Sequence, residues 1–320
     1  MVKQYQYLTQ AQIDHFMRYG YLRISNAFSL EKANEWVSDV WTRLGFDPND
    51  KSTWTKERIN MPNHKFEPVQ TFSPFAWGCI CELLGGEDRV DDISTRWSDG
   101  LIVNLGAPEW EGNWQQPKEL TNWHIDGDFF VHFLDSREQA LLVIPVFTEI
   151  KPQGGGTVIA PDGIKMIAKH LREHPEGVMP GGFNALDKIA QCEDFHEITG
   201  NPGDVVLMHP FMLHSPSRNS LRIPRIITNP PVLLKEPFDF DREDSEEYSL
   251  VEKKTLKELG VERLHEWKIR GQRRVVIPDR VRIQAQMRAH ELERLGKAAG
   301  IDGPEKWKTR LPTVLEILST

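Results

Sequence analysis

The stretch TNWHIDGDFF, residues 121–130, brings several chemically capable side chains together. In an extended strand, residues two apart point to the same face, so His124 and Asp126 would place an imidazole beside a carboxylate. Those two ligand types suit divalent iron, manganese or zinc. A His-x-Asp or His-x-Glu motif this short also arises by chance, and HPE at 174–176 is another example in this chain. The motif alone leaves two interpretations open, a metal site and a polar turn beside the core.

A second polar cluster lies in GDVVLMHPFMLHSPSRNSLRIPRIITN, residues 203–229. A Gly-Asp turn leads into an apolar strand, a histidine-rich segment follows, and a further strand opens at Arg225. His214 and Arg225 have ten residues between them, and a hairpin of that length can bring both side chains into one cavity. A second imidazole there would complete a set of two histidines and one carboxylate with positions left open for ligands. The guanidinium would then pair with a further carboxylate.

Each of these two assignments has a rival in the same segment. His209 ends the apolar strand and competes with His214 for the ligand role. Arg222 competes with Arg225 for the carboxylate. We favour His214 for its spacing to Arg225, and Arg225 because a proline before it and an Ile-Ile run after it place it at the start of a strand.

The bulk composition narrows the class of protein. The chain has 320 residues, 39% of them hydrophobic, a net charge of −8 and three cysteines. An acidic balance argues against nucleic acid or an anionic membrane as the main partner, and leaves a small molecule. Three cysteines imply no disulfide framework, and no stretch is apolar enough for a membrane span. We expect an intracellular, cytoplasmic protein in a reducing compartment.

The chain changes character twice along its length. Its first part predicts helices, from about residue 95 short β-rich runs follow one another between Gly, Pro and Asp, and charged helical sequence returns after residue 240. We expect a mainly β fold with flanking helices, a sandwich or barrel, in a domain of residues 1–240, with a helical C-terminal extension, 241–320, packed on it. The predicted helices are 9–20, 29–45, 74–86, 163–174 and 280–300, and 46–72 is predicted as a surface loop.

Three consecutive glycines stand in QGGGTVIAPDG, residues 153–163. Glycines are unusual inside a strand, so the run indicates a tight turn or a backbone pressed against another group. A phosphate-binding loop is the rival interpretation, but no GxxxxGK[ST] pattern is present.

In their order, these segments resemble the phytanoyl-CoA dioxygenase family of Fe(II)- and 2-oxoglutarate-dependent oxygenases. The resemblance covers roughly residues 8–230 and rests on LTQAQIDHFMRYGYLRI, on WHID, on QGGGTVIAP and on GDVVLMHPFMLHSPSRNSLRIPR. It implies a double-stranded β-helix, the jelly-roll or cupin-like barrel. It further implies that His124, Asp126 and His214 bind Fe(II), and that Arg225 pairs with the distal carboxylate of 2-oxoglutarate.

The family's PGSH turn is replaced here by APDG at 160–163, and Pro216 stands where the family often has a serine. A serine contact to the co-substrate is therefore not carried over. Related halogenases lack a carboxylate at the position of Asp126, so its presence argues against halogenation. The resemblance implies an oxidation of a small organic molecule, a secondary metabolite being one candidate, by dioxygen (O2) with release of succinate and CO2.

Further pocket residues follow from strand parity and proximity. Asn104 and Thr157 are candidates for contact with the co-substrate, each with a structural role as the alternative. The candidates for the substrate pocket are Trp114, Phe129, Phe130 and His132. Two other classes stay open, a cupin-type metal-dependent isomerase or epimerase with no need for Arg225, and a non-catalytic barrel that binds a ligand.

Overall fold

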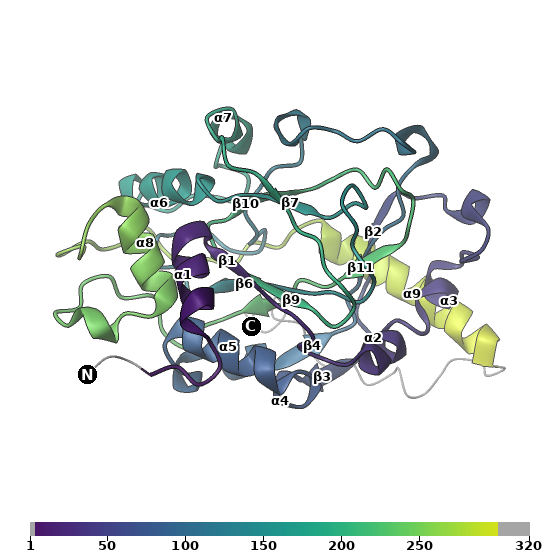
Figure 1. Cartoon of the computed structure of the whole chain (residues 1–320), viewed down its shortest axis with the longest axis horizontal. Helices are drawn as coiled ribbons and strands as arrows, with labels where there is room; N and C mark the ends of the chain where they lie inside the picture. Colours follow the sequence, from purple (N-terminus) through teal and green to yellow (C-terminus); the bar gives the residue numbers. More distant parts are fainter. Residues whose placement is uncertain (1–3, 300–320) are drawn as a thin grey trace.

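The computed structural model describes residues 4–299, in which an antiparallel β core carries helices on its outside (Figure 1). The strands are β1 (Tyr21–Ile24), β2 (Arg58–Asn60), β3 (Phe66–Pro68), β4 (Arg96–Ser98), β5 (Ile102–Asn104), β6 (Leu141–Pro145), β7 (Thr157–Ala160), β8 (His196–Glu197), β9 (Val205–Met208), β10 (Leu213–Pro216), β11 (Arg225–Ile227) and β12 (Pro231–Val232). The β-rich runs that were predicted from residue 95 onward are confirmed as strands, all of them short.

Within residues 4–299 the strands form four hydrogen-bonded sheets, with orders β1-β9-β6-β12, β10-β7-β8, β11-β5-β2 and β3-β4. An isolated bridge between Val146 and Ile227 links the first sheet to the third, and one between His124 and His214 extends the second. A β core with flanking helices is as expected, but among residues 4–299 the helices hold more residues than the strands, so the fold is mixed rather than mainly β. The described strands form no continuous closed ladder, so the double-stranded β-helix stays a prediction.

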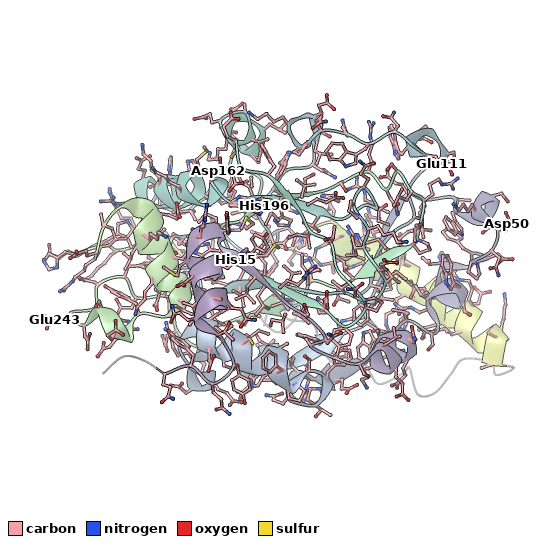
Figure 2. The ribbon with its side chains drawn as sticks, viewed as in Figure 1. His15, Asp50, Glu111, Asp162, His196 and Glu243 are labelled. Carbon is pink, nitrogen blue, oxygen red and sulfur yellow. The ribbon has the colours of Figure 1, made fainter. Side chains whose placement is uncertain are left out.

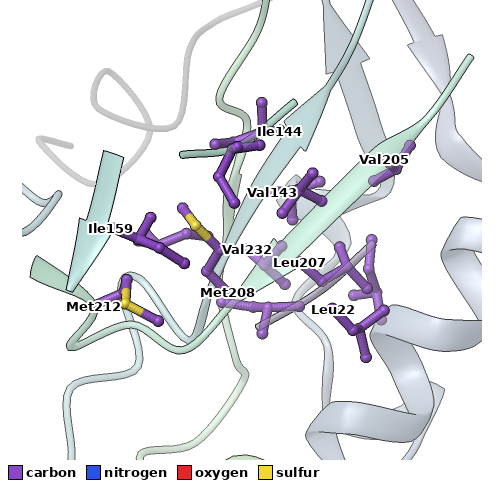
Figure 3. Close-up of a cluster of buried hydrophobic side chains, with 14 of the residues drawn as sticks. Leu22, Val143, Ile144, Ile159, Val205, Leu207, Met208, Met212 and Val232 are labelled. Carbon is purple, nitrogen blue, oxygen red and sulfur yellow. The ribbon is translucent and has the colours of Figure 1, made fainter. Parts of the chain in front are cut away.

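Strands β6 and β9 are buried on both faces and form the centre of the core. Figure 3 shows the side chains that pack there, from Leu22 on β1 to Val232 on β12. Leu22 and Leu207 are direct partners across β1 and β9, and both are fully buried. Burial on both faces explains why these strands are continuous apolar runs without alternation.

The helices in the described residues are α1 (Gln10–Tyr19), α2 (Leu30–Trp36), α3 (Val40–Leu44), α4 (Val69–Phe72), α5 (Pro74–Leu84), α6 (Gly163–Glu173), α7 (Ala185–Ile189), α8 (Leu250–Leu259) and α9 (Arg280–Ala299). Helix α1 has the predicted capping box between Thr9 and Gln12 and ends at Gly20 in the left-handed conformation. No helix among residues 4–299 is both long and apolar enough to cross a membrane.

One predicted helix, 29–45, is interrupted in the structure. Helix α2 ends at Trp36 and α3 begins at Val40, with a turn in which the Ser38 hydroxyl donates to the Glu35 carbonyl at 2.8 Å. This local bond of Ser38 to the backbone competes with a continuous helix. The apolar spacing that predicted one helix is kept on both sides of this turn.

The prediction that 46–72 is a surface loop was wrong in part, because this segment contains β2, β3 and α4. Strand β2 adds to the edge of β5, where Arg58 lies opposite Asn104. Strands of three residues are too short to show an alternation in the sequence, which is why the pattern did not reveal them.

The described part of the segment after residue 240 contains the helices α8 and α9, joined by the non-helical residues 260–279. Helix α8 packs on α1, α5 and α6, and α9 packs along α3, as Figure 1 shows in yellow. Residues 300–320 of the predicted extension lie outside the described residues. The separation of this extension from residues 1–240 as a unit of its own stays a prediction.

A buried ionic cluster fastens α9 to the rest of the molecule. Arg43 on α3 donates to Glu291 on α9 and to Asp99, each at 2.9 Å, and all three side chains are at most 1% exposed. His64 Nε2 lies 2.8 Å from the same Glu291 carboxylate. Asp99 also accepts the backbone N–H groups of His64 and Lys65 at 2.6 and 2.7 Å. Each buried charge is thus paired, which offsets the cost of removing it from water.

Replacing Arg43 with methionine should lower the free energy of unfolding by about 3–5 kcal/mol, since two buried carboxylates lose their cation. Urea denaturation followed by circular dichroism measures this loss. The matched control is Arg282→Met on the exposed side of α9, which should change stability by no more than about 0.5 kcal/mol. Equal effects of the two substitutions would contradict the stabilising role of the cluster.

Candidate metal centre and its cavity

Three side chains from two distant stretches of sequence converge at one point. His124 and His214 exchange two backbone hydrogen bonds, of 3.0 and 2.9 Å, which set the His-x-Asp step against β10. Their Nε2 atoms lie 3.5 and 3.6 Å from Oδ1 of Asp126. One ligand atom from each residue lies within 4.8 Å of the other two. Within residues 4–299 this is the only group of three or more such side chains close enough to hold one ion.

Both imidazole rings are oriented by their second nitrogen. Nδ1 of His124 lies 2.7 Å from the Asn122 carbonyl oxygen, and Nδ1 of His214 lies 3.0 Å from that of Met212. A carbonyl only accepts, so each Nδ1 donates, and Nε2 is the nitrogen that is turned toward Asp126. A backbone carbonyl behind a histidine is the usual arrangement for a metal-binding imidazole, because it fixes the ring and the tautomer.

The carboxylate of Asp126 is ionised in this setting. Burial raises its pKa, but the charge of His214 and hydrogen bonds from His124 and His214 lower it more, and the pKa lies well below its usual range. Once each Nε2 has lost its proton, two neutral imidazoles and one carboxylate form a donor set with one negative charge, which attracts a divalent cation. The residues present therefore fit a metal ion such as iron(II).

Arg225 lies in the wall of the same cavity and is only 2% exposed. Its Nε donates to the Gly155 carbonyl at 2.8 Å, while its Nη1 makes no hydrogen bond with any described residue. Burial and the nearby Arg58 lower its pKa to about 10, so it stays charged at neutral pH. A buried cation with an unused donor requires an anionic partner, and a ligand carboxylate is the simplest one.

The glycine run forms the tight turn that holds Arg225. Gly155 has a φ of +79°, and a Cβ there would lie 2.6 Å from Nδ2 of Asn104 and 2.7 Å from Cβ of Asn219. The expectation of a backbone pressed against another group is confirmed. Any side chain at this position would displace the turn and, with it, the carbonyl that accepts from Arg225.

Asn104 differs from the expectation. It is fully buried, and its amide donates to the carbonyls of Gly155 and Ser217 at 3.4 and 3.2 Å while its oxygen accepts from Gly106 N–H at 3.1 Å. It is not among the residues that line the cavity. Asn104 therefore holds the glycine turn in place and does not reach a ligand directly. Thr157 does line the cavity and stays a proposed contact.

The cavity has a volume of about 870 Å³, within the range of small-molecule sites. Its apolar part comes from the two central strands and β11, and includes Leu142, Ile144, Met208 and Ile227. Its polar part contains the three candidate metal ligands and Arg225. An apolar chamber with a few convergent polar groups is what a substrate site requires.

The predicted substrate-pocket residues divide into two groups. Phe129 lines the cavity, whereas Phe130, His132 and Trp114 do not. Phe130 packs between Phe129 and His132, with ring centroids 5.0 and 4.3 Å apart, so these rings support the wall from behind. An aromatic residue in a sequence gives no sign of whether its ring faces the core or a cavity.

His209, the rival ligand, faces away from the candidate metal ligands. It is fully buried, its Nε2 lies 2.9 Å from the Thr255 hydroxyl on α8, and its Nδ1 accepts from the Phe211 N–H at 3.1 Å. Burial and the charge of Lys254 lower its pKa to about 3. It is a neutral histidine that joins α8 to the core.

This histidine makes stability depend on pH. Its pKa is about 3 in the folded protein, against about 6.5 when unfolded, so the unfolded chain takes up the proton first. The stabilisation is complete above about pH 6.5 and is lost as pH falls toward the folded value. Between pH 7 and pH 5, wild type should lose about 2 kcal/mol more than a His209→Gln variant, as measured by urea denaturation. Equal losses would contradict the buried neutral state.

Arg222, the rival arginine, lies outside the cavity wall. Its guanidinium lies 3.7 Å from Glu111 and 5.8 Å from the ring centre of Trp54. Two further histidines, His15 and His196, lie near each other in Figure 2, and neither lines the cavity of the candidate metal ligands. These two pack with Tyr21, at ring distances of 4.9 and 5.6 Å.

Sequence reasoning missed one whole wall of the cavity. Helix α9 contributes Arg280, Val281, Gln284, Ala285 and Arg288. Strands β2 and β4 contribute Arg58 and Arg96. The spacing of the α9 residues, at three and four, was visible in the sequence as one helix face, but nothing there tied that face to a site almost 160 residues earlier.

Comparisons with solved structures give distant matches. The epimerase SnoN, solved with Fe3+, alpha ketoglutarate and nogalamycin RO, is 14% identical with a TM-score of 0.41, over 70% of this chain and 82% of that one. HygX from Streptomyces hygroscopicus, with nickel and 2-oxoglutarate, is 13% identical with a TM-score of 0.39, over 71% and 88%. EctD from S. alaskensis, with 2-oxoglutarate and 5-hydroxyectoine, is 17% identical with a TM-score of 0.38, over 71% and 75%.

No protein-family model and no curated protein matches the chain. Membership in the phytanoyl-CoA dioxygenase family therefore stays a prediction. The three structural matches are all below 20% identity and below a TM-score of one half, and a likeness this distant assigns no function.

Proposed function

We propose that this protein is an Fe(II)- and 2-oxoglutarate-dependent oxygenase that oxidises a small organic molecule. The observation that carries the proposal is the arrangement of four side chains in one cavity. His124, Asp126 and His214 come together as a metal-binding set, and Arg225 is buried in the same wall with an unused donor. A metal enzyme without 2-oxoglutarate would have no use for the last of these.

The three ligands would hold iron(II) on one side and leave its other positions open toward the cavity. The backbone carbonyls of Asn122 and Met212 keep both imidazoles in the orientation that metal binding needs. With bound 2-oxoglutarate and O2, the iron would supply the oxidation and release succinate and CO2.

Arg225 would bind the distal carboxylate of 2-oxoglutarate. Its Nε is fixed by the Gly155 carbonyl, so Nη1 is free to donate to a carboxylate oxygen. The carbonyl itself is held by Asn104. Thr157 lines the cavity and would add a hydroxyl contact. A guanidinium already fixed in place loses little freedom on binding, which strengthens the interaction.

The apolar wall would hold the substrate and exclude water. Leu142, Ile144 and Met208 line the cavity, and Phe129 adds an aromatic ring. Oxidation of a C–H bond needs such a dry chamber, because water competes for a reactive oxidant. We propose hydroxylation or a related C–H oxidation of a small organic molecule, with a secondary metabolite as one candidate.

The proposal is tested by incubating purified protein anaerobically with Fe(II), then adding 2-oxoglutarate, ascorbate and air. Succinate should form slowly even without substrate, in an uncoupled reaction that an added substrate accelerates. A cupin-type isomerase or a non-catalytic barrel would bind the metal and yield no succinate. Protein that retains iron but forms no succinate above a protein-free control contradicts the proposal.

A further inference from the structure

A turn with a glycine in it follows directly on Asp126, the one carboxylate of the candidate metal centre. Gly127 has a φ of +112°, a conformation that residues with a side chain rarely adopt. A glycine beside a ligand leaves the backbone of that ligand free to rotate unless another group holds it. The direction in which the Asp126 carboxylate points therefore depends on what fixes this turn.

The side chain that holds the turn is His132. Its Nε2 lies 2.8 Å from the Gly127 carbonyl oxygen, and because a carbonyl only accepts, Nε2 donates. Within residues 4–299, no other side chain makes a hydrogen bond to the backbone of residues 125–128. The ring also packs directly on the glycine, since a Cβ at Gly127 would lie 2.7 Å from Cε1 of His132.

His132 is itself fixed in place. Its backbone forms a bridge with Val178, in which each N–H donates to the other's carbonyl, at 2.8 and 2.9 Å. Its ring lies against Phe130 and Phe183, with centroids 4.3 and 4.9 Å apart, and the residue is only 4% exposed. Burial lowers its pKa to about 4, so the imidazole is neutral at pH 7 and has one N–H, the one that Gly127 accepts. A donor held this firmly restricts its acceptor as well.

We propose that His132 is a positioning residue for the metal centre, because its hydrogen bond to the Gly127 carbonyl holds the turn that aims the Asp126 carboxylate at the two imidazoles. His132 does not line the cavity, so it acts through the turn and not on a ligand. The segment at Val178, between α6 and α7, thereby supports the metal centre from behind. The effect on an ion rests on the proposed function, whereas the hold on the turn is measured without any ion.

Two substitutions separate the hydrogen bond from the packing. His132→Phe keeps a ring against Phe130 and Phe183 and removes the N–H. His132→Gln keeps a donor, because its amide nitrogen is as many bonds from the backbone as Nε2 is. The matched control is His209→Phe, the same chemical change at a histidine that is also buried but that joins α8 to the core.

The first measurement is the affinity for Co(II), titrated into protein freed of metal with a chelator and followed by its visible absorption. His132→Phe should weaken binding by about 10- to 100-fold, the loss typical of a group that orients a metal ligand. His132→Gln should stay within about threefold of wild type, because the turn keeps its donor. His209→Phe should stay within about twofold even where it lowers stability, since a purely structural loss does not reach the ligands.

The second measurement is hydrogen–deuterium exchange in metal-free protein. Peptides that cover residues 121–131 should exchange about three- to tenfold faster in His132→Phe, the factor that one neutral hydrogen bond contributes to local opening. The same peptides should be unchanged in His132→Gln and in His209→Phe. Peptides of the central strands β6 and β9 should be unchanged in all three variants, which shows that the effect is confined to the turn.

Gly127→Ala disrupts the same contact from the turn, because its Cβ would displace the His132 ring. It should speed exchange and weaken Co(II) binding as His132→Phe does, so the role is decided even where the phenylalanine chain fails to fold. Unchanged exchange at 121–131, no recovery by His132→Gln, or an equal loss of affinity in His209→Phe would overturn this inference. Wild type that binds no Co(II) would instead contradict the proposed metal centre, and the exchange rates would still decide whether His132 holds the turn.

Discussion

Replacing Asp126 with alanine should abolish iron retention and succinate formation. Asp126 is the only carboxylate in the group of three. Its negative charge attracts the divalent ion, which the two neutral imidazoles cannot do by charge. Loss of a group that merely supports a ligand costs about 10- to 100-fold in metal affinity, so loss of a ligand should exceed about 100-fold. Iron content after gel filtration and an anaerobic Fe(II) titration measure the effect.

The matched control is Asp128→Ala, two residues further on. Asp128 also lines the cavity, but it pairs with Arg280 and is not part of the group of three. This variant should keep iron and the uncoupled formation of succinate. Full iron binding by the Asp126 variant, or an equal loss in both, would exclude the proposed ligand set.

Replacing Arg225 with glutamine should raise the apparent KM for 2-oxoglutarate by at least about 30-fold, with iron still bound. Removing the buried charged partner of a ligand carboxylate weakens binding by about 2–5 kcal/mol, because the carboxylate charge is then left unpaired in the cavity. Arg225→Lys should recover only part of the loss, since an ammonium keeps the charge without the planar fork. Initial rates of succinate formation across 2-oxoglutarate concentrations give the KM.

The matched control is Arg222→Gln, which removes the rival arginine three residues earlier. Arg222 is 7% exposed and lies outside the cavity wall, so the KM should change less than about twofold. An unchanged KM in the Arg225 variant would reject its role. A larger effect at Arg222 would mean that the two assignments should be exchanged.

One part of the site could be predicted from the sequence because it follows from short-range geometry. His124 and Asp126 are two apart, so few conformations were open to that pair. The predicted hairpin between His214 and Arg225 was wrong, because β10 pairs with β7 and β11 pairs with β5, in different sheets. That the segments around His124 and His214, 90 residues apart, come together was predicted from the order of the motifs. In the structure, the backbone bridge between His124 and His214 brings them together. That bridge is a backbone contact and leaves no mark on the sequence.

Other features depend on long-range packing that no local pattern encodes. Asn104 was expected to face a ligand, yet its amide is used up by backbone groups more than 50 residues away. The wall of the cavity at α9 depends on the contact of Glu291 with Arg43, two charged residues that a pattern assigns to the surface. Buried ion pairs are rare enough that a sequence reading places such residues in solvent.

Short elements were the other source of error. The break at 37–39 and the strands β2 and β3 involve three residues each, below the length at which periodicity separates helix, strand and loop. Strand β2 places Arg58 on the other side of Asn104 from Arg225, and after burial the charge of Arg58 contributes to the lowered pKa of Arg225. The missed strand thus affects the electrostatics of the site directly.

The central claim is that one iron ion binds to His124, Asp126 and His214. Crystals grown and soaked with Fe(II) without oxygen, measured on both sides of the iron absorption edge, locate the metal by its anomalous signal. The account predicts a single strong peak within bonding distance of both Nε2 atoms and of the Asp126 carboxylate. A peak on other side chains, or none at this position in protein shown to retain iron, would contradict it.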